Sequence, residues 1–506
     1  MVGDVFQSPS SSQLLVESGP EICYSGDLAQ VFLELLDMIR LNIGEPFSNC
    51  TKVSRRSFLT VGSAGVAGLS LPGILANEAM AATTVRGKSL IMIHLDGGPP
   101  QMDLIDPKPY APSEVRSPFA PISTNVPGLG LTELMPQCAR IADKLVFLRS
   151  LVGSDGKHHA FQCQSGYGEK ALKSIGGRPA LGCVVKHLLG RPEDEVPNFI
   201  DLMQGRPLVR NSARPGFLGI SCKPFRPDIS DIWKRELETG MKGELKRLGN
   251  DHKTELSLIH DLPVKRLDDR LELLRSIDRF QRDLDTSGSM NAMDQFHQQA
   301  YKVLTSGAFA EAMDISAEDP RVVDHYTPED VSRGTQSYTS EGPDALLKFM
   351  LARRLIEAGV RVVSVSLSDF DTHSDNNNRM RHLGPLFDHG FHALVTDLES
   401  RGMLDDTIVL AWGEFGRTPK VNSKGGRDHW PSASMGVMAG GGMPGGLVLG
   451  ATDREAGKVV DRPLAYSDVI ATLYRKLGIN PQTIIHDQTG RPHVLMSEGS
   501  PVSELV

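Results

Sequence analysis

Short apolar runs alternate along this chain with longer amphipathic segments. Runs such as RVVSVSL and TIVLAW are typical of strands buried on both faces, and apolar residues at helical spacing mark the segments between them. The predicted strands are Ser89–Leu95, Leu145–Val152, Arg361–Leu367, Thr407–Trp412 and about Ser434–Ala439. The predicted helices are Leu131–Lys144, Asp344–Ala358, about Gly384–Arg401 and Tyr466–Leu477. This alternation predicts an α/β fold: a mostly parallel, mixed central sheet with helices on both faces.

One long segment departs from this pattern. From about residue 228 to 310 the chain is helical in its spacing, charged and rich in glutamine, with little strand signal. Within it, Leu267–Leu284 (LDDRLELLRSIDRFQRDL) is clearly amphipathic. We predict a helical insertion or cap on the main domain.

The N-terminal segment has the pattern of an export signal. Ser54–Leu59 reads SRRSFL, an apolar, glycine-rich run follows at Val61–Leu75, and Ala79-Met80-Ala81 resembles a cleavage site. The run is shorter than the roughly 20 residues of a transmembrane helix; a buried core helix is the alternative. We predict a twin-arginine signal within residues 1–81 and one domain over 82–506. The mature protein would be periplasmic or otherwise extracytoplasmic, delivered by the Tat export machinery, with no stable membrane span after cleavage.

Charge and cysteine content exclude several classes of protein. The net charge of −8 gives no electrostatic footprint for nucleic acid or anionic lipid, so no nucleic-acid partner is expected. The six cysteines are spread singly, without a CxxC pair. This argues against a zinc knuckle or a thioredoxin-type motif, and it does not indicate a disulfide scaffold.

Acidic residues and histidines follow four of the predicted strands. In α/β sheets, ligands bind at the carboxyl ends of the strands. The residues in these positions are Asp96 and Asp103, His158 and His159, Asp371 and His373, and Glu414, Asp428 and His429. A single Asp after a strand is more often a helix N-cap, and two adjacent histidines can simply lie on the surface. The repetition at four strand ends is what indicates a site.

The residue types point to metal chemistry. Carboxylates and imidazoles without thiols suit divalent Zn, Mn or Mg ions, and four strand ends supply enough ligands for two of them. Such a pair of ions can stabilise both the attacking and the leaving oxygen of an ester displacement. The predicted metal ligands are Asp96, Asp103, His159, Asp371, His373, Glu414, Asp428 and His429. The predicted catalytic residues are His158 and Arg417, with Arg417 as a bidentate partner of a phosphoryl or sulfuryl oxygen.

A cysteine motif suggests a different nucleophile. Cys222-Lys-Pro-Phe-Arg226 matches C-x-P-x-R, the core of the sulfatase motif whose cysteine becomes formylglycine. It stands more than a hundred residues after Asp96, between proline-rich turns, and continues Pro-Asp-Ile-Ser instead of reaching Thr-Gly. Packing of a loop is therefore the default interpretation.

Four stretches together resemble one known family. They are GGPPQMDLIDPKP (97–109), ADKLVFLRSL (142–151), FDTHSDN (370–376) and GEFGRTPK…GRDHWP (413–431). They are similar to the Tat-exported bacterial proteins catalogued as domain of unknown function 1501, over nearly the whole mature chain. The resemblance implies membership of the alkaline phosphatase and sulfatase superfamily, with an alkaline-phosphatase-like mixed sheet and a binuclear metal site.

Carried over by position, the resemblance implies roles for individual residues. The first-strand ligand would be Asp96 or Asp103, and Asp371 with His373 would be later ligands. Glu414 would stand where the superfamily usually has an Asp-His pair, and His429 would be the last histidine. Two features depart from the family pattern: Pro100 replaces a common serine, and no Ser, Thr or Cys nucleophile opens a helix after the second strand.

Three functional hypotheses follow. The first is an exported, metal-dependent hydrolase of an anionic phosphate or sulfate ester that uses metal-activated water, since a nucleophilic side chain is missing. The second is a non-catalytic binding or scaffold protein that keeps the fold for an anionic glycan or another partner. The third is a true sulfatase that uses Cys222. The density of acidic and histidine residues favours the first, and the missing nucleophile favours the second.

Overall fold

The computed structural model describes residues 87–174, 176–191, 193–204, 212–233, 302–303, 306–328, 339 and 341–506. The chain divides into two units, Met1–Val85 and Arg86–Val506, and all described residues belong to the second. The predicted signal segment lies outside the described residues, as does most of the predicted insertion at 228–310. In the part of the chain that is described, no helix has the length and apolar character needed to cross a membrane.

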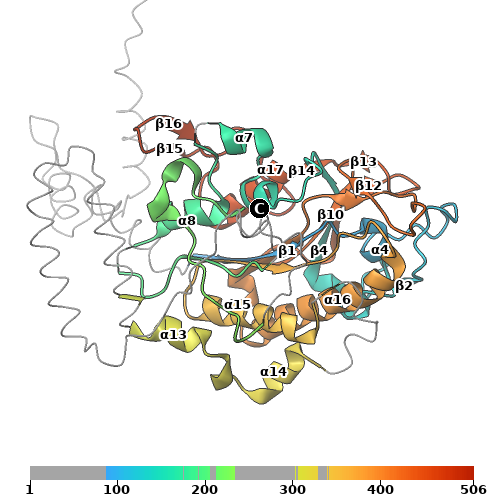
Figure 1. The fold of residues 1–506 in the computed structure, drawn as a ribbon, viewed down its shortest axis with the longest axis horizontal. Helices are drawn as coiled ribbons and strands as arrows, with labels where there is room; N and C mark the ends of the chain where they lie inside the picture. Colours follow the sequence, from blue (N-terminus) through green and yellow to red (C-terminus); the bar gives the residue numbers. More distant parts are fainter. Residues whose placement is uncertain are drawn as a thin grey trace, which may run out of the picture. The chain divides into compact units, whose positions relative to one another are not determined.

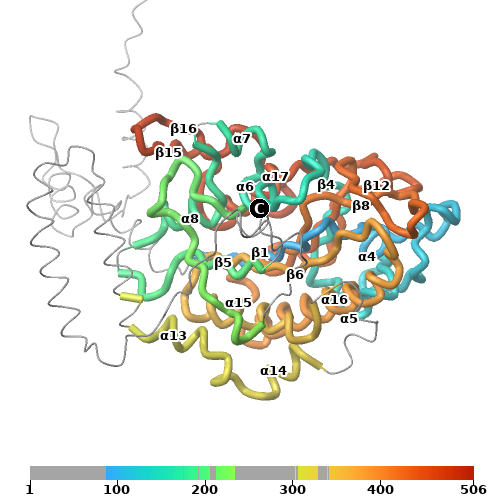
Figure 2. The backbone as a smooth tube through the Cα atoms, viewed as in Figure 1, coloured from blue at the N-terminus to red at the C-terminus, as the bar shows by residue number. Residues whose placement is uncertain are grey.

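A mixed, mostly parallel sheet forms the centre of this unit (Figure 1). In spatial order its strands are β11 (Leu447–Leu449), β4 (Leu145–Val152), β10 (Ser434–Gly440), β7 (Thr407–Trp412), β1 (Ser89–Leu95), β6 (Val362–Leu367) and β5 (Phe199–Asp201), and β14 (Leu464–Ala465) pairs with β4. β10 is antiparallel to both of its neighbours, and the other pairings are parallel. β1 therefore lies between two strands from the C-terminal half of the chain (Figure 2).

Helices cover both faces of the sheet (Figure 1). One face packs against α5 (Pro136–Arg140), α13 (Ala308–Met313), α14 (Pro320–Tyr326), α15 (Leu347–Glu357) and α16 (Asn376–Ser400). The other packs against α6 (Phe161–Ser165), α7 (Glu169–Lys173), α8 (Leu181–Leu189) and α17 (Tyr466–Lys476). Because every central strand is buried on both faces, its sequence reads as a continuous apolar run. The predicted fold class is confirmed.

Smaller elements lie around the sheet. α4 (Gln101–Leu104) follows β1, and in the described part of the chain four short antiparallel ribbons connect the loops. The ribbons are β2 (Pro121–Ser123) with β3 (Gly130–Thr132), β8 (Gly416–Arg417) with β9 (His429–Trp430), β12 (Ala451–Thr452) with β13 (Val459–Asp461), and β15 (Ile484–His486) with β16 (Pro492–Val494). The β8–β9 ribbon carries the GEFGRTPK…GRDHWP signature.

The predicted strands agree with the structure almost residue for residue, and two predicted helices do not. The helix expected over 131–144 is interrupted, because β3 occupies its start and α5 begins at Pro136. Proline lacks a backbone N–H and favours the first helical position, so the helix begins there. The helix expected from about Gly384 begins at Asn376 and continues through Pro385, which therefore does not mark its start.

Two glycines let the chain turn sharply at the end of β1. Gly97 and Gly98 have φ values of +108° and +79°, a region that suits glycine. A Cβ on Gly97 would lie 2.4 Å from the backbone nitrogen of Asp371, and one on Gly98 would lie 2.4 Å from the ring of Phe415. The turn therefore brings the loops after β1, β6 and β7 into direct contact.

Candidate metal centre

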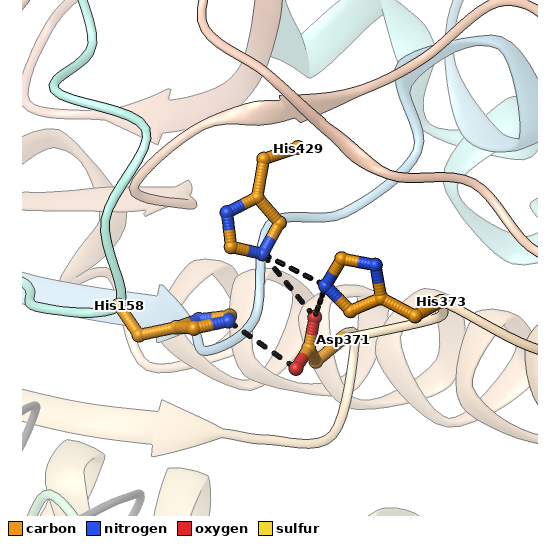
Figure 3. A group of neighbouring side chains, drawn as sticks. All are labelled: His158, Asp371, His373 and His429. Carbon is orange, nitrogen blue, oxygen red and sulfur yellow. Dashed lines mark hydrogen bonds and ion pairs between the residues drawn. The ribbon is translucent and has the colours of Figure 1, made fainter.

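The candidate site lies at the carboxyl ends of β1, β4, β6 and β7. Among the described residues, two sets of side chains have ligand atoms within 4.8 Å of one another. We call His158, Asp371, His373 and His429 the open group, and His94, Asp96 and Glu414 the buried group. The open group comes from the loops after β4 and β6 and from β9 (Figure 3). The buried group comes from β1 and the residues that follow β1 and β7.

Three donor atoms of the open group converge on one point. Asp371 Oδ1 lies 3.1 Å from His373 Nε2 and 3.5 Å from His429 Nε2, and the two Nε2 atoms are 3.0 Å apart (Figure 3). Ligands about 2.1 Å from a tetrahedral metal ion lie roughly 3.4 Å from each other. The three atoms thus have the mutual spacing of ligands around one ion.

The opposite ring nitrogens fix the tautomers of the two histidines. His429 Nδ1 lies 2.9 Å from the Gly156 carbonyl oxygen, which can only accept, so Nδ1 carries the proton. His373 Nδ1 lies 2.6 Å from Asp428 Oδ1, and a carboxylate oxygen also accepts. With both rings neutral, each Nε2 atom therefore turns a lone pair toward Asp371. Histidines that ligate metals are held by this kind of partner on their other nitrogen.

His158 connects the two groups. Its Nε2 lies 3.2 Å from Asp371 Oδ2, and its Nδ1 lies 3.3 Å from Glu414 Oε1. Burial alone would lower the pKa of His158, but hydrogen bonds to Asp371 and Glu414 and their negative charges outweigh it and raise the pKa to about 9. In this arrangement His158 is an imidazolium between two carboxylates.

The buried group is less exposed to solvent than the open group. His94 Nε2 is 3.3 Å from Glu414 Oε2, and their side chains are 0% and 1% exposed. Glu414 Oε1 accepts the backbone N–H of Gly97 at 2.9 Å. Burial would raise the pKa of Glu414, but hydrogen bonds to His158 and His94 and their charges hold it below its usual range. Asp96 completes the group.

Arg417 is buried behind Asp371. Its Nη2 lies 2.6 Å from Asp371 Oδ1 and also donates to the Gly97 carbonyl, while Nε and Nη1 donate to the carbonyls of Gly98 and Arg427. The side chain is 0% exposed. A clamp on a substrate anion would need a guanidinium that reaches solvent. The geometry instead gives Arg417 a positioning role, because it holds Asp371 in place.

The charge of Asp371 is stabilised from several sides. Burial would raise the pKa of this carboxyl, but the hydrogen bond from His158 and the charges of Arg417 and His158 hold it well below its usual range. Asp371 is therefore ionised at any ordinary pH, as a metal ligand must be.

Three of the predicted ligands lie outside both groups. Asp103 is fully buried, with Oδ2 3.1 Å from Arg427 Nε and 2.8 Å from Asn376 Nδ2, so Asp96 is the residue that β1 contributes. Asp428 contacts the far nitrogen of His373 and orients it. His159 has no hydrogen-bond partner for its ring within the described residues, and burial lowers its pKa. Its neighbour His158, predicted as catalytic, is a member of the open group.

Cys222 also lies away from both groups. It is buried beside α8, with Sγ 3.9 Å from Ser221 Oγ and 3.8 Å from His187 Nδ1. Arg226 of the same motif pairs with Asp201 at the end of β5. The C-x-P-x-R match therefore packs against the edge of the sheet, in agreement with its default interpretation.

One member of the site was missed from the sequence. His94 is inside the apolar run SLIMIHL, which by its composition predicts only a strand. The available signal was its position two residues before Asp96, because alternate strand residues share a face. A lone histidine in an otherwise apolar, buried strand is the feature that could have identified it.

Fold and site together define an α/β protein with two sets of metal-type ligands at the carboxyl edge of its sheet. The chain belongs to the family described as protein of unknown function (DUF1501), whose model matches residues 87–506. The family expected from the sequence is confirmed. No curated protein matches the sequence.

Solved structures that resemble the chain include three enzymes. A sulfatase from Pseudoalteromonas sp. is 11% identical, with 79% of this chain and 70% of that chain covered and a TM-score of 0.33. The phosphonate monoester hydrolase of Agrobacterium radiobacter is 13% identical, with 83% of this chain and 77% of that chain covered and a TM-score of 0.31. The lipoteichoic acid synthase LtaP from Listeria monocytogenes is 10% identical, with 81% of this chain and 76% of that chain covered and a TM-score of 0.30. At such low similarity, the function has to be argued from the residues of this chain.

Proposed function

We propose that the protein is an exported, metal-dependent hydrolase of phosphate or sulfate esters. The observation that carries this proposal is the convergence of Asp371 Oδ1, His373 Nε2 and His429 Nε2, each with a lone pair directed at the same point. Without a cation, these atoms would repel one another at 3.0–3.5 Å. A divalent ion bound by all three turns the repulsion into attraction.

Each residue near this point has a specific role. A bound divalent ion would polarise the ester oxygen and lower the pKa of a water molecule. Arg417 fixes Asp371 in place, and Asp428 fixes His373. His158, with its pKa raised to about 9 and its side chain 19% exposed, keeps a proton at neutral pH. It is suited to donate that proton to the oxygen of the leaving group.

Export and the class of substrate rest on the sequence. The twin-arginine pattern within residues 1–81 supports delivery outside the cytoplasm. The resemblance to the alkaline phosphatase and sulfatase superfamily supports an anionic ester as the substrate. The ligand set agrees with that class, since carboxylate and imidazole ligands hold the borderline and hard ions that bind phosphoryl or sulfuryl oxygens.

A second candidate is a non-catalytic protein that binds an anionic glycan through the same ions. Two observations favour it. The helix that follows β4, α6, begins at Phe161 with Ala160 as its N-cap, so no serine, threonine or cysteine stands at its start. Arg417, the expected anion clamp, is also buried.

Metal analysis combined with an ester panel separates these candidates. Protein exported through its own signal is assayed for bound metal and for hydrolysis of aryl phosphate, phosphonate and sulfate esters. We expect stoichiometric metal and turnover of at least one ester, and loss of both in His429→Gln. Absence of metal would overturn the proposal. Metal without turnover of any ester would favour the glycan-binding candidate.

A further inference from the structure

Two candidate ligands lie on a short segment with an unusual backbone. Asp371 and His373 lie between β6 and α16, and their segment is bounded by Asp369, with φ +75°, and Asp375, with φ +48°. Of the described residues other than glycine, only four have a positive φ. This left-handed conformation is disfavoured for a residue with a side chain, and it persists where neighbouring groups hold it. The groups that hold the segment therefore help to position the two ligands.

Side chains from outside the segment hold Asp369 in this conformation. Arg379 of α16 donates from its two terminal nitrogens to the backbone carbonyls of Asp369 and Asp371, at 3.0 and 2.8 Å. The hydroxyl of Thr339 donates to the carboxylate of Asp369. Asp369 is thus fixed through its backbone and through its side chain.

A buried ion pair holds the start of the same segment. Glu341 and, in α15, Lys348 lie 3.2 Å apart, and both side chains are 0% exposed. Lys348 Nζ also donates to the backbone carbonyl of Ser366 at 2.7 Å. The other carboxylate oxygen of Glu341, Oε1, accepts the backbone N–H of Ser368 at 2.9 Å. Each member of the pair thus binds the backbone at the carboxyl end of β6.

The ion pair is itself fixed from two further sides. Lys348 Nζ lies 3.7 Å from the centre of the Trp233 ring, and the face of an indole attracts a cation. Nε2 of the buried His382 in α16 lies 2.6 Å from the backbone carbonyl oxygen of Glu341. A carbonyl oxygen can only accept, so this nitrogen carries the proton. These contacts hold the pair in one position.

A buried ion pair is a poor source of stability. Removing two charges from water costs about as much as their attraction returns, and apolar side chains of similar volume often stabilise the fold as well or better. An apolar side chain cannot, however, supply a directed acceptor for the Ser368 N–H. Ser368, Phe370 and Thr372 are 0% exposed, and the Phe370 N–H donates to the Asp96 carbonyl at 3.0 Å. Because this segment is tightly packed, a shift at Ser368 is passed on to Asp371.

We propose that Glu341 and Lys348 are positioning residues of the candidate metal centre. The pair fixes the chain where it leaves β6, so that Asp371 and His373 meet His429 at the spacing of metal ligands. Neither residue is a member of the open group or of the buried group. The inference rests on the proposed function only in treating the open group as a metal site.

Two matched double variants test the acceptor for Ser368. Glu341→Gln/Lys348→Met and Glu341→Leu/Lys348→Met both remove the whole pair, so neither leaves a buried charge without its partner. Glutamine keeps a side-chain oxygen that can accept the Ser368 N–H, and leucine has none. The full chain, freed of metal with EDTA, is titrated with Zn²⁺ and with Mn²⁺ well below the urea concentration at which each variant unfolds. Loss of stability therefore does not enter the measured affinity.

We expect E341L/K348M to bind metal at the open group more weakly by about 10-fold or more, the size of effect that outer partners of metal ligands have. E341Q/K348M should bind nearly as tightly as the wild type. His373→Asn, which lacks a ligand of the open group, shows which binding step belongs to that group. The control for stability is Arg353→Met. Arg353 lies in the same helix and pairs with Asp397 at 2.8 Å, so this variant should unfold at lower urea and keep its metal affinity.

The outcomes separate this inference from the proposed function. Equal metal affinities in the two double variants would overturn the inference and leave the hydrolase proposal standing, and so would an equal loss of affinity in Arg353→Met. Absence of metal binding in the wild type would overturn both. If E341L/K348M does not fold, Glu341→Asp decides, since it keeps the charge of the pair and withdraws the acceptor by one methylene group. Wild-type metal affinity in Glu341→Asp then contradicts the inference.

Discussion

Two buried arginines of the β8–β9 ribbon and its loop each form an ion pair with an aspartate, yet only one of these pairs belongs to the candidate metal centre. Arg417 of β8 pairs with Asp371 at 2.6 Å, and Arg427, two residues before His429, pairs with Asp103 at 3.1 Å. Both guanidiniums are 0% exposed, and both also donate to backbone carbonyls. By the ion pair alone, the two aspartates cannot be told apart.

The difference lies in the remaining partners of each carboxylate. Asp371 also faces His158, His373 and His429 and is 13% exposed, whereas Asp103 accepts a hydrogen bond from the side-chain amide of Asn376. The first pair holds a candidate ligand in a site that is open to solvent. The second joins α4 to the β8–β9 loop and α16. What marks Asp371 as a candidate ligand is therefore the set of imidazoles that converge on it, and not its arginine.

The largest expected effect is that of Asp371→Asn. The change removes the ligand charge and leaves Arg417 buried without its partner, a situation that costs about 3–5 kcal/mol in stability. We expect metal affinity of the open group to fall by more than about 100-fold, since changes to outer partners alone cost about 10–100-fold. Ester hydrolysis and metal content would be measured together with urea unfolding.

The control for this variant is Asp375→Asn. Asp375 lies in the same loop outside both groups, with φ +48°, a conformation that asparagine tolerates. If both variants lose metal equally, the ligand role of Asp371 is refuted.

Asp103→Asn should affect stability and leave metal binding intact. It leaves the fully buried Arg427 without its carboxylate, so the free energy of unfolding should fall by about 3–5 kcal/mol. The folded fraction should still bind metal at the open group with wild-type affinity, measured by titration below the unfolding transition. A specific loss of metal affinity in folded protein would show that the two pairs are functionally alike.

Asp388 is a third buried aspartate, and its contribution to stability should depend on pH. Asp388 of α16 accepts the backbone N–H groups of Gln137 and Cys138, at 2.8 and 2.7 Å. Burial raises the pKa of Asp388 to about 6, although these hydrogen bonds oppose the rise. The pKa in the unfolded chain is about 3.9. Because the folded-state pKa is the higher one, the stability that Asp388 contributes is complete below about pH 4 and is lost as the pH rises through about 6.

The loss amounts to about 3 kcal/mol, since a pKa difference of about two corresponds to about 1.4 kcal/mol per unit. Urea unfolding of the wild type and of Asp388→Asn at several pH values measures it. The difference in unfolding free energy between the two proteins should change by this amount between pH 4 and pH 7. A difference independent of pH would refute the assignment.

The smallest effect is expected for Asp428→Asn. Asp428 contacts His373 from outside, and its side chain is 54% exposed, so stability should hardly change. Weaker orientation of the His373 ring should reduce metal affinity by about 10-fold or somewhat more. Asp428→Glu, which can reach the same nitrogen, should restore part of the affinity. An unchanged affinity in Asp428→Asn would remove Asp428 from the metal centre.

The strands and the location of the site could be predicted from the sequence, and the roles of the individual residues could not. Apolar runs marked the strands because buried parallel strands need apolar side chains on both faces. The rule that ligands bind at the carboxyl ends then led to Asp96, Asp371, His373, Glu414 and His429. His94 stands in an apolar run, so the pattern assigns it to the strand and not to the site. His159 was predicted as a metal ligand and His158 as a catalytic residue, but periodicity does not tell which of two adjacent loop residues faces the site.

The sequence by itself determined the α/β architecture, the family and the set of polar residues at the strand ends, since these depend on local periodicity and motif. Tertiary structure alone decided which of them act together. Arg417, expected to bind a substrate anion, is buried against Asp371, and Asp103 pairs with Arg427. His94 and Glu414 meet through the pairing of β1 with β7, strands more than three hundred residues apart in the chain. Contacts between such distant segments depend on strand order and on the turn at Gly97 and Gly98, which local sequence patterns do not specify.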